Sequence, residues 1–261
     1  MKKIVFFSFL AVILIISVTG CGKKNPNVQY SQRLQPDTAE YYLNEGILYL
    51  NSGDLNTAEQ KLMKALKKKP TLVDAILGLG IINLNRGNFK QAVEYFQQVV
   101  RINPNSFDAY NFLGVSYSEL GEYNIAKENL LIAANAEKYK TPENAYANLA
   151  TLEIKQQRYE SALRYIEKGL EKNDKFAQLY NLKGVVMENV GKLEDAIAWY
   201  QKALTFLKAE DATILINIAR IYTKMGNKGK AMDMLEKALP SATSPEIKEQ
   251  IRNLIKDLEK K

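Results

Sequence analysis

The chain contains no histidine, and among its 261 residues the only cysteine is Cys21. These absences exclude zinc sites built from cysteine and histidine, and they exclude Ser-His-Asp and Cys-His nucleophile systems. A single cysteine also excludes an internal disulfide. We therefore expect no cofactor and no metal site, and we predict that the protein is not an enzyme.

The chain also lacks a dense cluster of basic residues. The formal net charge is +7, which becomes about +5 if Lys2 and Lys3 are removed with the N-terminal segment. A nucleic-acid-binding protein needs a localised basic stripe, commonly interleaved with aromatic residues, and no such stripe is present. Hydrophobic residues make up 46% and charged residues 25%, which is ordinary for a folded protein. We expect a folded protein with no nucleic-acid partner.

The N-terminal segment, residues 1–20, has a basic start followed by an apolar run of about 15 residues. This length fits a secretory signal peptide better than a membrane span of ~20 residues. The segment ends in Val18-Thr19-Gly20 before Cys21, a pattern that resembles the bacterial lipobox. The resemblance implies cleavage before Cys21, a diacylglyceryl group on its sulfur, and acylation of the new amino group. The alternative is a plain membrane anchor with an incidental cysteine.

The predicted lipid anchor places the protein in the bacterial cell envelope. Several acyl chains anchor a protein stably where a single chain would be marginal. In two-membrane bacteria an aspartate after the lipidated cysteine commonly signals inner-membrane retention. Gly22 stands at that place here, so by family analogy we expect the outer membrane, facing the periplasm. A single-membrane host would place the protein on the outer face of its plasma membrane.

Residues 21–38 comprise the lipidated cysteine and a polar segment with two prolines and no hydrophobic period. We expect this segment to be a flexible tether between the membrane and the rest of the chain.

From Ala39 onwards the sequence repeats with a period of 34 residues. Gly46, Gly80 and Gly114 lie 34 residues apart, and an alanine follows each of them by twelve residues. A repeat of this length is one helix-turn-helix unit, which cannot bury its apolar face alone and must stack on its neighbours. The pattern resembles the tetratricopeptide repeat, which has small residues at positions 8 and 20, where its two helices cross.

We therefore predict an all-α fold, a right-handed superhelical solenoid of six tetratricopeptide repeats with a C-terminal capping helix. The repeats are expected within residues 39–245, at 39–72, 73–106, 107–140, 143–176, 177–210 and 212–245, and the capping helix at 246–261. Two extra residues precede the fourth repeat, and we expect them to bend the array into two halves. Five repeats have glycine in the turn between their helices. The fourth repeat has Gln157 there, so we expect its turn to differ.

In the tetratricopeptide family the first helix of each repeat lines a concave face, chiefly through positions 2, 5, 6, 9, 12 and 13. At positions 5, 6 and 9 this chain places mainly amides and apolar side chains. The candidate partner-binding groove consists of Asn44, Ile47, Asn111, Phe112, Val115, Asn148, Thr151, Asn181, Val185, Asn217 and Arg220. The Lys/Asn/Arg constellation by which chaperone-binding relatives hold a C-terminal carboxylate is absent.

The five asparagines of this groove suggest a specific way of binding. An asparagine side chain both donates and accepts hydrogen bonds, so it can pair with the backbone of an extended peptide whatever its sequence. We hypothesise that these amides clamp an extended segment of a partner. The alternative is that they are solvated amides on helix faces.

Two further features have both a packing and a binding explanation. Tyr95, Tyr165 and Trp199 place an aromatic residue at position 23, where consensus repeats often carry one, and this favours packing. After Ser244 and Pro245, an apolar stripe consists of Ile247, Ile251, Leu254, Ile255 and Leu258. We expect this stripe to cap the open end of the array, although it could instead bind a partner as an amphipathic helix.

The complete plan, with a lipobox, a tether, six repeats and a closing helix, resembles the pilotin lipoproteins of type IV pilus systems, the PilF/PilW/Tgl family. The segment from Tyr139 to Leu149 is similar to that family's fourth repeat. The resemblance implies a protein that escorts a secretin subunit to the outer membrane and promotes its assembly into a ring. Its partner would then be an extended segment of the secretin or of another envelope protein. Asn83, Glu153 and Met187, at position 11, depart from the general repeat consensus.

An alternative is a general envelope adaptor that recruits peptidoglycan hydrolases or serves outer-membrane protein assembly. An enzyme is disfavoured, because the many Asp/Glu pairs fall at solvent-facing helix positions. A glycosidase would need two carboxylates held across a cleft.

Overall fold

The computed structural model describes residues 35–260, so the predicted signal peptide, Cys21 and most of the predicted tether lie outside the described residues. This part of the chain folds entirely into α-helices and has no strand. The helices are α1 (Ala39–Asn51), α2 (Leu55–Lys68), α3 (Val73–Asn85), α4 (Phe89–Ile102), α5 (Phe107–Glu119), α6 (Tyr123–Asn135), α7 (Pro142–Lys155), α8 (Tyr159–Lys172), α9 (Ala177–Asn189), α10 (Leu193–Thr205), α11 (Ala212–Lys224), α12 (Lys228–Ser241) and α13 (Pro245–Glu259). None of these helices has the length and apolar content needed to cross a membrane.

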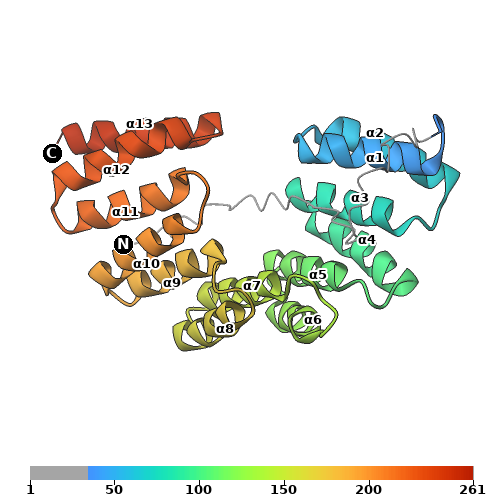
Figure 1. Cartoon of the computed structure of the whole chain (residues 1–261), viewed down its shortest axis with the longest axis horizontal. Coiled ribbons are helices and arrows are strands. Elements are labelled where there is room, and N and C mark those ends of the chain that lie inside the picture. Colours follow the sequence, from blue (N-terminus) through green and yellow to red (C-terminus); the bar gives the residue numbers. More distant parts are fainter. Residues whose placement is uncertain (1–34, 261) are drawn as a thin grey trace, which may run out of the picture. The chain divides into compact units, whose positions relative to one another are not determined.

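The helices belong to two compact units, which are described separately. Unit 1 ends at Glu122 and contains α1 to α5, and unit 2 begins at Tyr123 and contains α6 to α13. The boundary lies inside the predicted third repeat, and not at the two-residue insertion, residues 141–142. Within each unit, the second helix of a pair packs on the first helix of the next pair, and several first helices also contact each other, as α1 contacts α3 and α7 contacts α9 (Figure 1). This stacking is that of a tetratricopeptide solenoid and confirms the predicted fold class.

Small residues allow the two helices of a pair to approach closely. The alanines at position 20 have no exposed surface, and they are Ala58, Ala92, Ala126, Ala162, Ala196 and Ala231. A Cβ atom added at Gly80 would lie 2.4 Å from Phe96 Cε1, and one added at Gly184 would lie 2.6 Å from Tyr200. The close packing within the pairs α3–α4 and α9–α10 therefore explains why glycine and alanine recur in the 34-residue period.

The turn of the fourth repeat has the same conformation as the other turns. Gln157 has a φ of 59°, and the glycines at the equivalent place, Gly53, Gly87, Gly121, Gly191 and Gly226, have φ between 73° and 83°. The hydrogen bonds match as well, because Arg158 N donates to Glu153 O at 2.8 Å and Glu122 N donates to Tyr117 O at 2.9 Å. The expectation that this turn differs is therefore wrong, because its backbone conformation is that of the other turns. The packed helices hold Gln157 in a backbone region that favours glycine.

The first repeat differs from the others because no described helix precedes α1. Position 10 is at most 1% exposed in the later repeats, at Ile82, Ser116, Leu152, Val186 and Ile221, whereas Leu48 of α1 is 66% exposed. Position 7 carries Glu45 in α1, and its carboxylate accepts hydrogen bonds from Lys61 at 2.7 Å and Tyr41 at 3.1 Å. Polar residues thus replace part of the apolar contact surface at the beginning of the array.

At the other end, α13 covers the last helix pair. Ile251 and Leu258 are 0% and 6% exposed and pack into one core with residues of α11 and α12. Ile247, Leu254 and Ile255 are partly buried against the same core. The helix begins after Ser244, whose hydroxyl oxygen accepts a hydrogen bond from Ile247 N at 3.2 Å.

Candidate partner-binding surface

The first helices of unit 1 present a row of partly exposed aliphatic side chains. Position 9 is occupied by Ile47, Ile81 and Val115, on α1, α3 and α5. Since α3 contacts both α1 and α5, equivalent positions on these helices lie side by side. Residues at positions 5, 9 and 12 share one face of a helix, because they are separated by four and three residues.

We call this row the unit 1 ladder, and it consists of Ile47, Leu50, Leu77, Ile81, Leu84 and Val115. Five of the six are half-buried, and Ile81 is buried, with 8% of its surface exposed. None of the six is charged, so a partner could cover the ladder without desolvating an ion there. The exposed acids Glu40, Asp74 and Asp108 lie in the first turns of the same helices, where they favour the positive end of the helix dipole. The geometry suits the apolar side chains of a protein segment.

Phe112 belongs to the core and contributes little to an open surface. It is 6% exposed and stacks on Phe96, with ring centroids 5.2 Å apart and an interplanar angle of 17°. Its place at position 6 therefore explains how α4 and α5 pack, but it does not provide a contact for a partner in this structure.

The asparagines of the predicted clamp are distributed over both units and differ in exposure. In unit 1, Asn44 is exposed and Asn111 is 2% exposed. In unit 2, Asn148 is half-buried, and Asn181 and Asn217 are both 8% exposed. Burial removes Asn111, Asn181 and Asn217 from contact with a peptide in this structure. The Asn181 Oδ1 atom is buried and accepts no hydrogen bond from the described residues.

The equivalent positions of unit 2 are more polar than those of unit 1. Val185 is half-buried, and Thr151 is half-buried with its hydroxyl donating to Ala147 O at 2.9 Å. Arg220 is exposed as a residue, yet its guanidinium is engaged by Glu188 through two hydrogen bonds, Nε to Oε1 at 3.1 Å and Nη2 to Oε2 at 2.7 Å. Arg220 therefore forms an ion pair between helices and is not an unpaired cation in a groove.

Glu188 lies at the centre of this network, and sequence reasoning did not single it out. Its side chain is 8% exposed, and its carboxylate also accepts hydrogen bonds from Lys224 at 2.7 Å and Tyr200 at 3.2 Å. Burial acts to raise the pKa of this carboxyl, but the hydrogen bonds from Arg220 and Lys224 outweigh it, and the net effect lowers the pKa. Arg220 and Lys224 are four residues apart on α11, a spacing that could have indicated a shared anionic partner.

Glu153 shows how the structure accommodates a departure from the repeat consensus. Its side chain is 1% exposed, and Oε1 accepts a hydrogen bond from Lys127 of α6 at 2.6 Å. Oε2 has no hydrogen-bond partner among the described residues, although the Arg158 guanidinium lies 4.0 Å away. An ion pair thus occupies position 11, where the consensus has a tyrosine.

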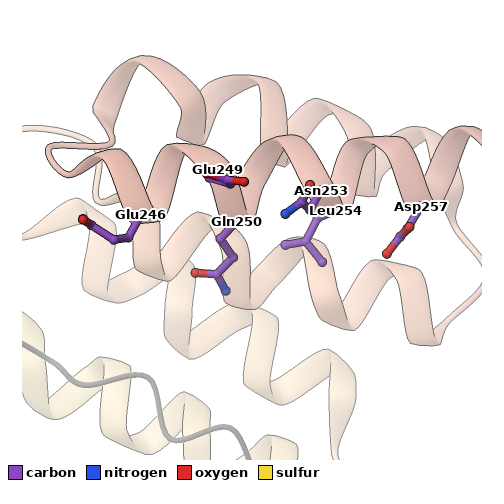
Figure 2. Close-up of a pocket in the computed structure, with 6 residues that line it drawn as sticks. All are labelled: Glu246, Glu249, Gln250, Asn253, Leu254 and Asp257. Atoms are coloured by element: carbon purple, nitrogen blue, oxygen red, sulfur yellow. The ribbon is translucent and has the colours of Figure 1, made fainter.

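A hollow lies on α13 of unit 2. Figure 2 shows its lining side chains, which all come from α13: Glu246, Glu249, Gln250, Asn253, Leu254 and Asp257. A single helix supplies every wall, so the hollow does not gather groups from different elements as a catalytic site would. No group of three or more acidic, cysteine or histidine side chains that could hold a metal ion occurs between residues 35 and 260.

Three family matches together extend over most of the helical part of the chain. Residues 49–114 and residues 107–133 match two tetratricopeptide repeat families. Residues 131–256 match the C-terminal ARM domain of tetratricopeptide repeat protein 21. All three families consist of stacked helical repeats.

Two curated proteins are similar to part of the chain. The TPR repeat-containing protein MJ0263 of Methanocaldococcus jannaschii is 34% identical over 99 residues, which cover 36% of this chain and 30% of that protein. The uncharacterized protein ycf37 of Cyanophora paradoxa is 32% identical over 104 residues, which cover 38% of this chain and 60% of that protein. The chain thus spans less than two thirds of the length of either relative.

Solved structures match the fold over a larger part of the chain. PilW, described as a widely conserved type IV pilus biogenesis factor, has a TM-score of 0.68 at 20% identity, covering 82% of this chain and 97% of PilW. Pseudomonas aeruginosa pilF has a TM-score of 0.63 at 19% identity, with coverages of 82% and 96%. A tetratricopeptide repeat protein from Parabacteroides merdae has a TM-score of 0.70 at 20% identity and 87% coverage of both chains.

At these identities the structural likenesses establish the fold alone, and the family matches establish the nature of the repeats. Tetratricopeptide arrays typically serve as non-catalytic scaffolds that bind other proteins. The described residues therefore have the fold of a tetratricopeptide-repeat solenoid, and parts of the chain match tetratricopeptide-repeat families.

Proposed function

We propose that this protein is a lipid-anchored scaffold of the bacterial envelope that acts as a pilotin. In this role it takes a secretin subunit of a type IV pilus system to the outer membrane and promotes its assembly into a ring. The proposal depends chiefly on one combination of features. A lipobox-like sequence at Val18–Cys21 precedes a repeat array whose fold covers 97% of PilW and 96% of pilF.

The unit 1 ladder is the surface that best suits the partner. Its side chains are aliphatic and uncharged, all but Ile81 are partly exposed, and neighbouring helices repeat them at regular spacing. An extended or helical segment of the partner can place successive apolar side chains against such a row. Burial of apolar area then supplies the binding free energy, at roughly 25 cal/mol per Å² before the costs of association are subtracted.

Complementation of a host strain that lacks the gene tests this proposal. The wild-type protein is expected to restore secretin rings in the outer membrane, measured by membrane fractionation and detection of the assembled multimer. The Cys21→Ser variant is expected to leave the secretin unassembled or in the inner membrane, because it has no site for a lipid. A Gly22→Ala variant, which retains the cysteine, is the matched control and should behave like the wild type.

Two results would contradict the pilotin function. One is normal secretin assembly in the strain without the gene. The other is normal assembly in the Cys21→Ser strain together with a protein that acquires no radioactive fatty acid. If deletion of the gene instead changes peptidoglycan hydrolysis or the insertion of outer-membrane proteins, the protein is a general envelope adaptor and not a pilotin.

A further inference from the structure

The fifth repeat contains a lysine at a position that is apolar in most of the other repeats. Position 7 is occupied by leucine or isoleucine in four repeats, at Leu79, Leu113, Leu149 and Ile218, and each of these side chains is at most 4% exposed. In the fifth repeat the residue is Lys183, which is half-buried. Its ammonium group lies 4.1 Å from the ring centroid of Trp199, the only tryptophan of the chain. The lysine thus directs its charge to the indole face and not into the core.

Trp199 is one end of a row of three stacked rings. Tyr180 lies 6.1 Å from Trp199 with an interplanar angle of 14°, and Phe206 lies 5.2 Å from Tyr180 with an angle of 21°. A second ammonium group, that of Lys202, lies 4.6 Å from the Tyr180 centroid and 5.4 Å from the Trp199 centroid. The residues come from α9, α10 and the segment after α10. Two cations therefore converge on one aromatic row.

Unlike Lys127, Arg220 and Lys224 of the same unit, these two lysines have no carboxylate partner. Lys127 is paired with Glu153, and Arg220 and Lys224 are paired with Glu188. In the part of the chain that the structure describes, no carboxylate lies within 4.0 Å of the ammonium group of Lys183 or Lys202, and the indole N–H of Trp199 donates to no acceptor. The Tyr180 hydroxyl, in contrast, donates to Asp174 O at 2.8 Å.

We propose that Lys183, Lys202 and Trp199 form a docking surface for an acidic segment of a protein partner. The surface offers three hydrogen-bond donor groups that have no acceptor among the described residues, namely two ammonium groups and one indole N–H, and it carries two positive charges. A carboxylate is the protein group that supplies only acceptors and a negative charge. The half-buried ring of Phe206 and the Leu207 side chain, which is 36% exposed, provide apolar contact next to the charges. This surface lies in unit 2, so it is distinct from the unit 1 ladder and does not depend on it.

The single tryptophan allows a direct test with the detergent-solubilised full-length protein. A peptide of alternating glutamate and glycine is titrated while the fluorescence of Trp199 is recorded. The expected result is a saturable change that weakens as salt is added, since ion pairs at a surface are screened. A peptide in which lysine replaces every glutamate should cause no change.

Variants locate the site. A Lys183→Met/Lys202→Met double variant should bind the glutamate peptide on the order of tenfold more weakly, because two ion pairs to the peptide are lost. Methionine preserves the length of the apolar stem. Lys230→Met is the matched control, because Lys230 lies over an aromatic ring outside the stacked row, 5.4 Å from the Tyr222 centroid. Lys202→Met alone changes an exposed residue, so it measures the effect if the double variant fails to fold.

Three results would overturn the proposal. They are equal affinity of wild type and Lys202→Met, equal loss of affinity in Lys230→Met, and equal binding of the glutamate peptide and free sodium glutamate at the same carboxylate concentration. The last two would mean that the protein attracts anions without a defined site.

Discussion

Gln157 adopts the left-handed backbone conformation that glycine adopts in the equivalent turns of the described array. A residue with a Cβ atom loses about 1–2 kcal/mol of stability in this conformation. Glycine avoids this strain, but its greater conformational entropy in the unfolded chain offsets part of the stabilisation. Gln157→Gly should therefore stabilise the protein by about 0.5–1 kcal/mol, measured as a higher midpoint in urea unfolding followed by circular dichroism.

The neighbouring residue supplies the control for that substitution. Gln156 has a negative φ, −88°, at the end of α7, so Gln156→Gly brings no relief of strain and should be neutral or destabilising. A lower midpoint for Gln157→Gly than for the wild type would contradict the interpretation of the turn.

The buried carboxylate of Glu188 predicts a dependence of stability on pH. Since hydrogen bonds from Arg220 and Lys224 lower its pKa in the folded protein, the carboxylate stabilises the fold above the unfolded pKa of about 4.3. This contribution is lost as the pH falls through the lower pKa of the folded state. Glu188→Gln should reduce the free energy of unfolding at pH 7 by about 1–2 kcal/mol, because both cations are about half exposed and partly screened.

The difference between wild type and Glu188→Gln should diminish when unfolding is measured below about pH 4. Glu194, an exposed acid of the same unit, provides the comparison, because Glu194→Gln should change the free energy of unfolding by less than about 0.5 kcal/mol. An equal difference between wild type and Glu188→Gln at pH 7 and at pH 3 would show that the ion pairs do not stabilise the fold.

At the scale of helices, the first repeat and a middle repeat contain the same residue at the same position in different surroundings. Leu48 of α1 is 66% exposed, and Leu152 of α7 is 1% exposed. Leu152→Ala should cost about 2–5 kcal/mol because it leaves a cavity. Leu48→Ala should cost less than about 0.5 kcal/mol. The comparison uses urea unfolding of the two variants, and similar losses would mean that α1 is covered in solution.

The helices themselves could be predicted from the sequence because the small residues that bring them together recur every 34 residues. Gly80 and Ala92, for example, lie where Phe96 leaves no room for a larger side chain. The exposure of the groove asparagines could not be predicted in this way. Asn44 and Asn217 occupy the same position, yet Asn44 is exposed and Asn217 is only 8% exposed. The reason is that no described helix precedes α1, whereas α11 packs on α10, α12 and α13.

The buried ion pairs of unit 2 also could not be predicted from the repeat pattern. The consensus describes positions one repeat at a time, whereas Glu188 finds its partners on α11, more than thirty residues further along the chain. Glu153 was noted as a departure at position 11, but its pairing with Lys127 depends on how α6 packs against α7. Pairs of this kind come from stacking and require the structure.

For the whole molecule, the unit 1 ladder is the central claim, because the proposed scaffold function needs a surface that holds a partner. Photo-crosslinking in living cells tests it most directly, with a photoreactive residue placed at Ile47 or at Val115. Ile125, which lies on α6 in unit 2 and is 40% exposed, provides a matched aliphatic control site. Mass spectrometry then identifies each adduct.

We predict a protein adduct from Ile47 and from Val115, with the same partner at both sites and no such adduct from Ile125. A secretin adduct would support the pilotin function, and a hydrolase or assembly factor would support the envelope adaptor. The absence of any adduct from both ladder sites, together with an adduct from Ile125, would contradict the claim that the ladder binds the partner.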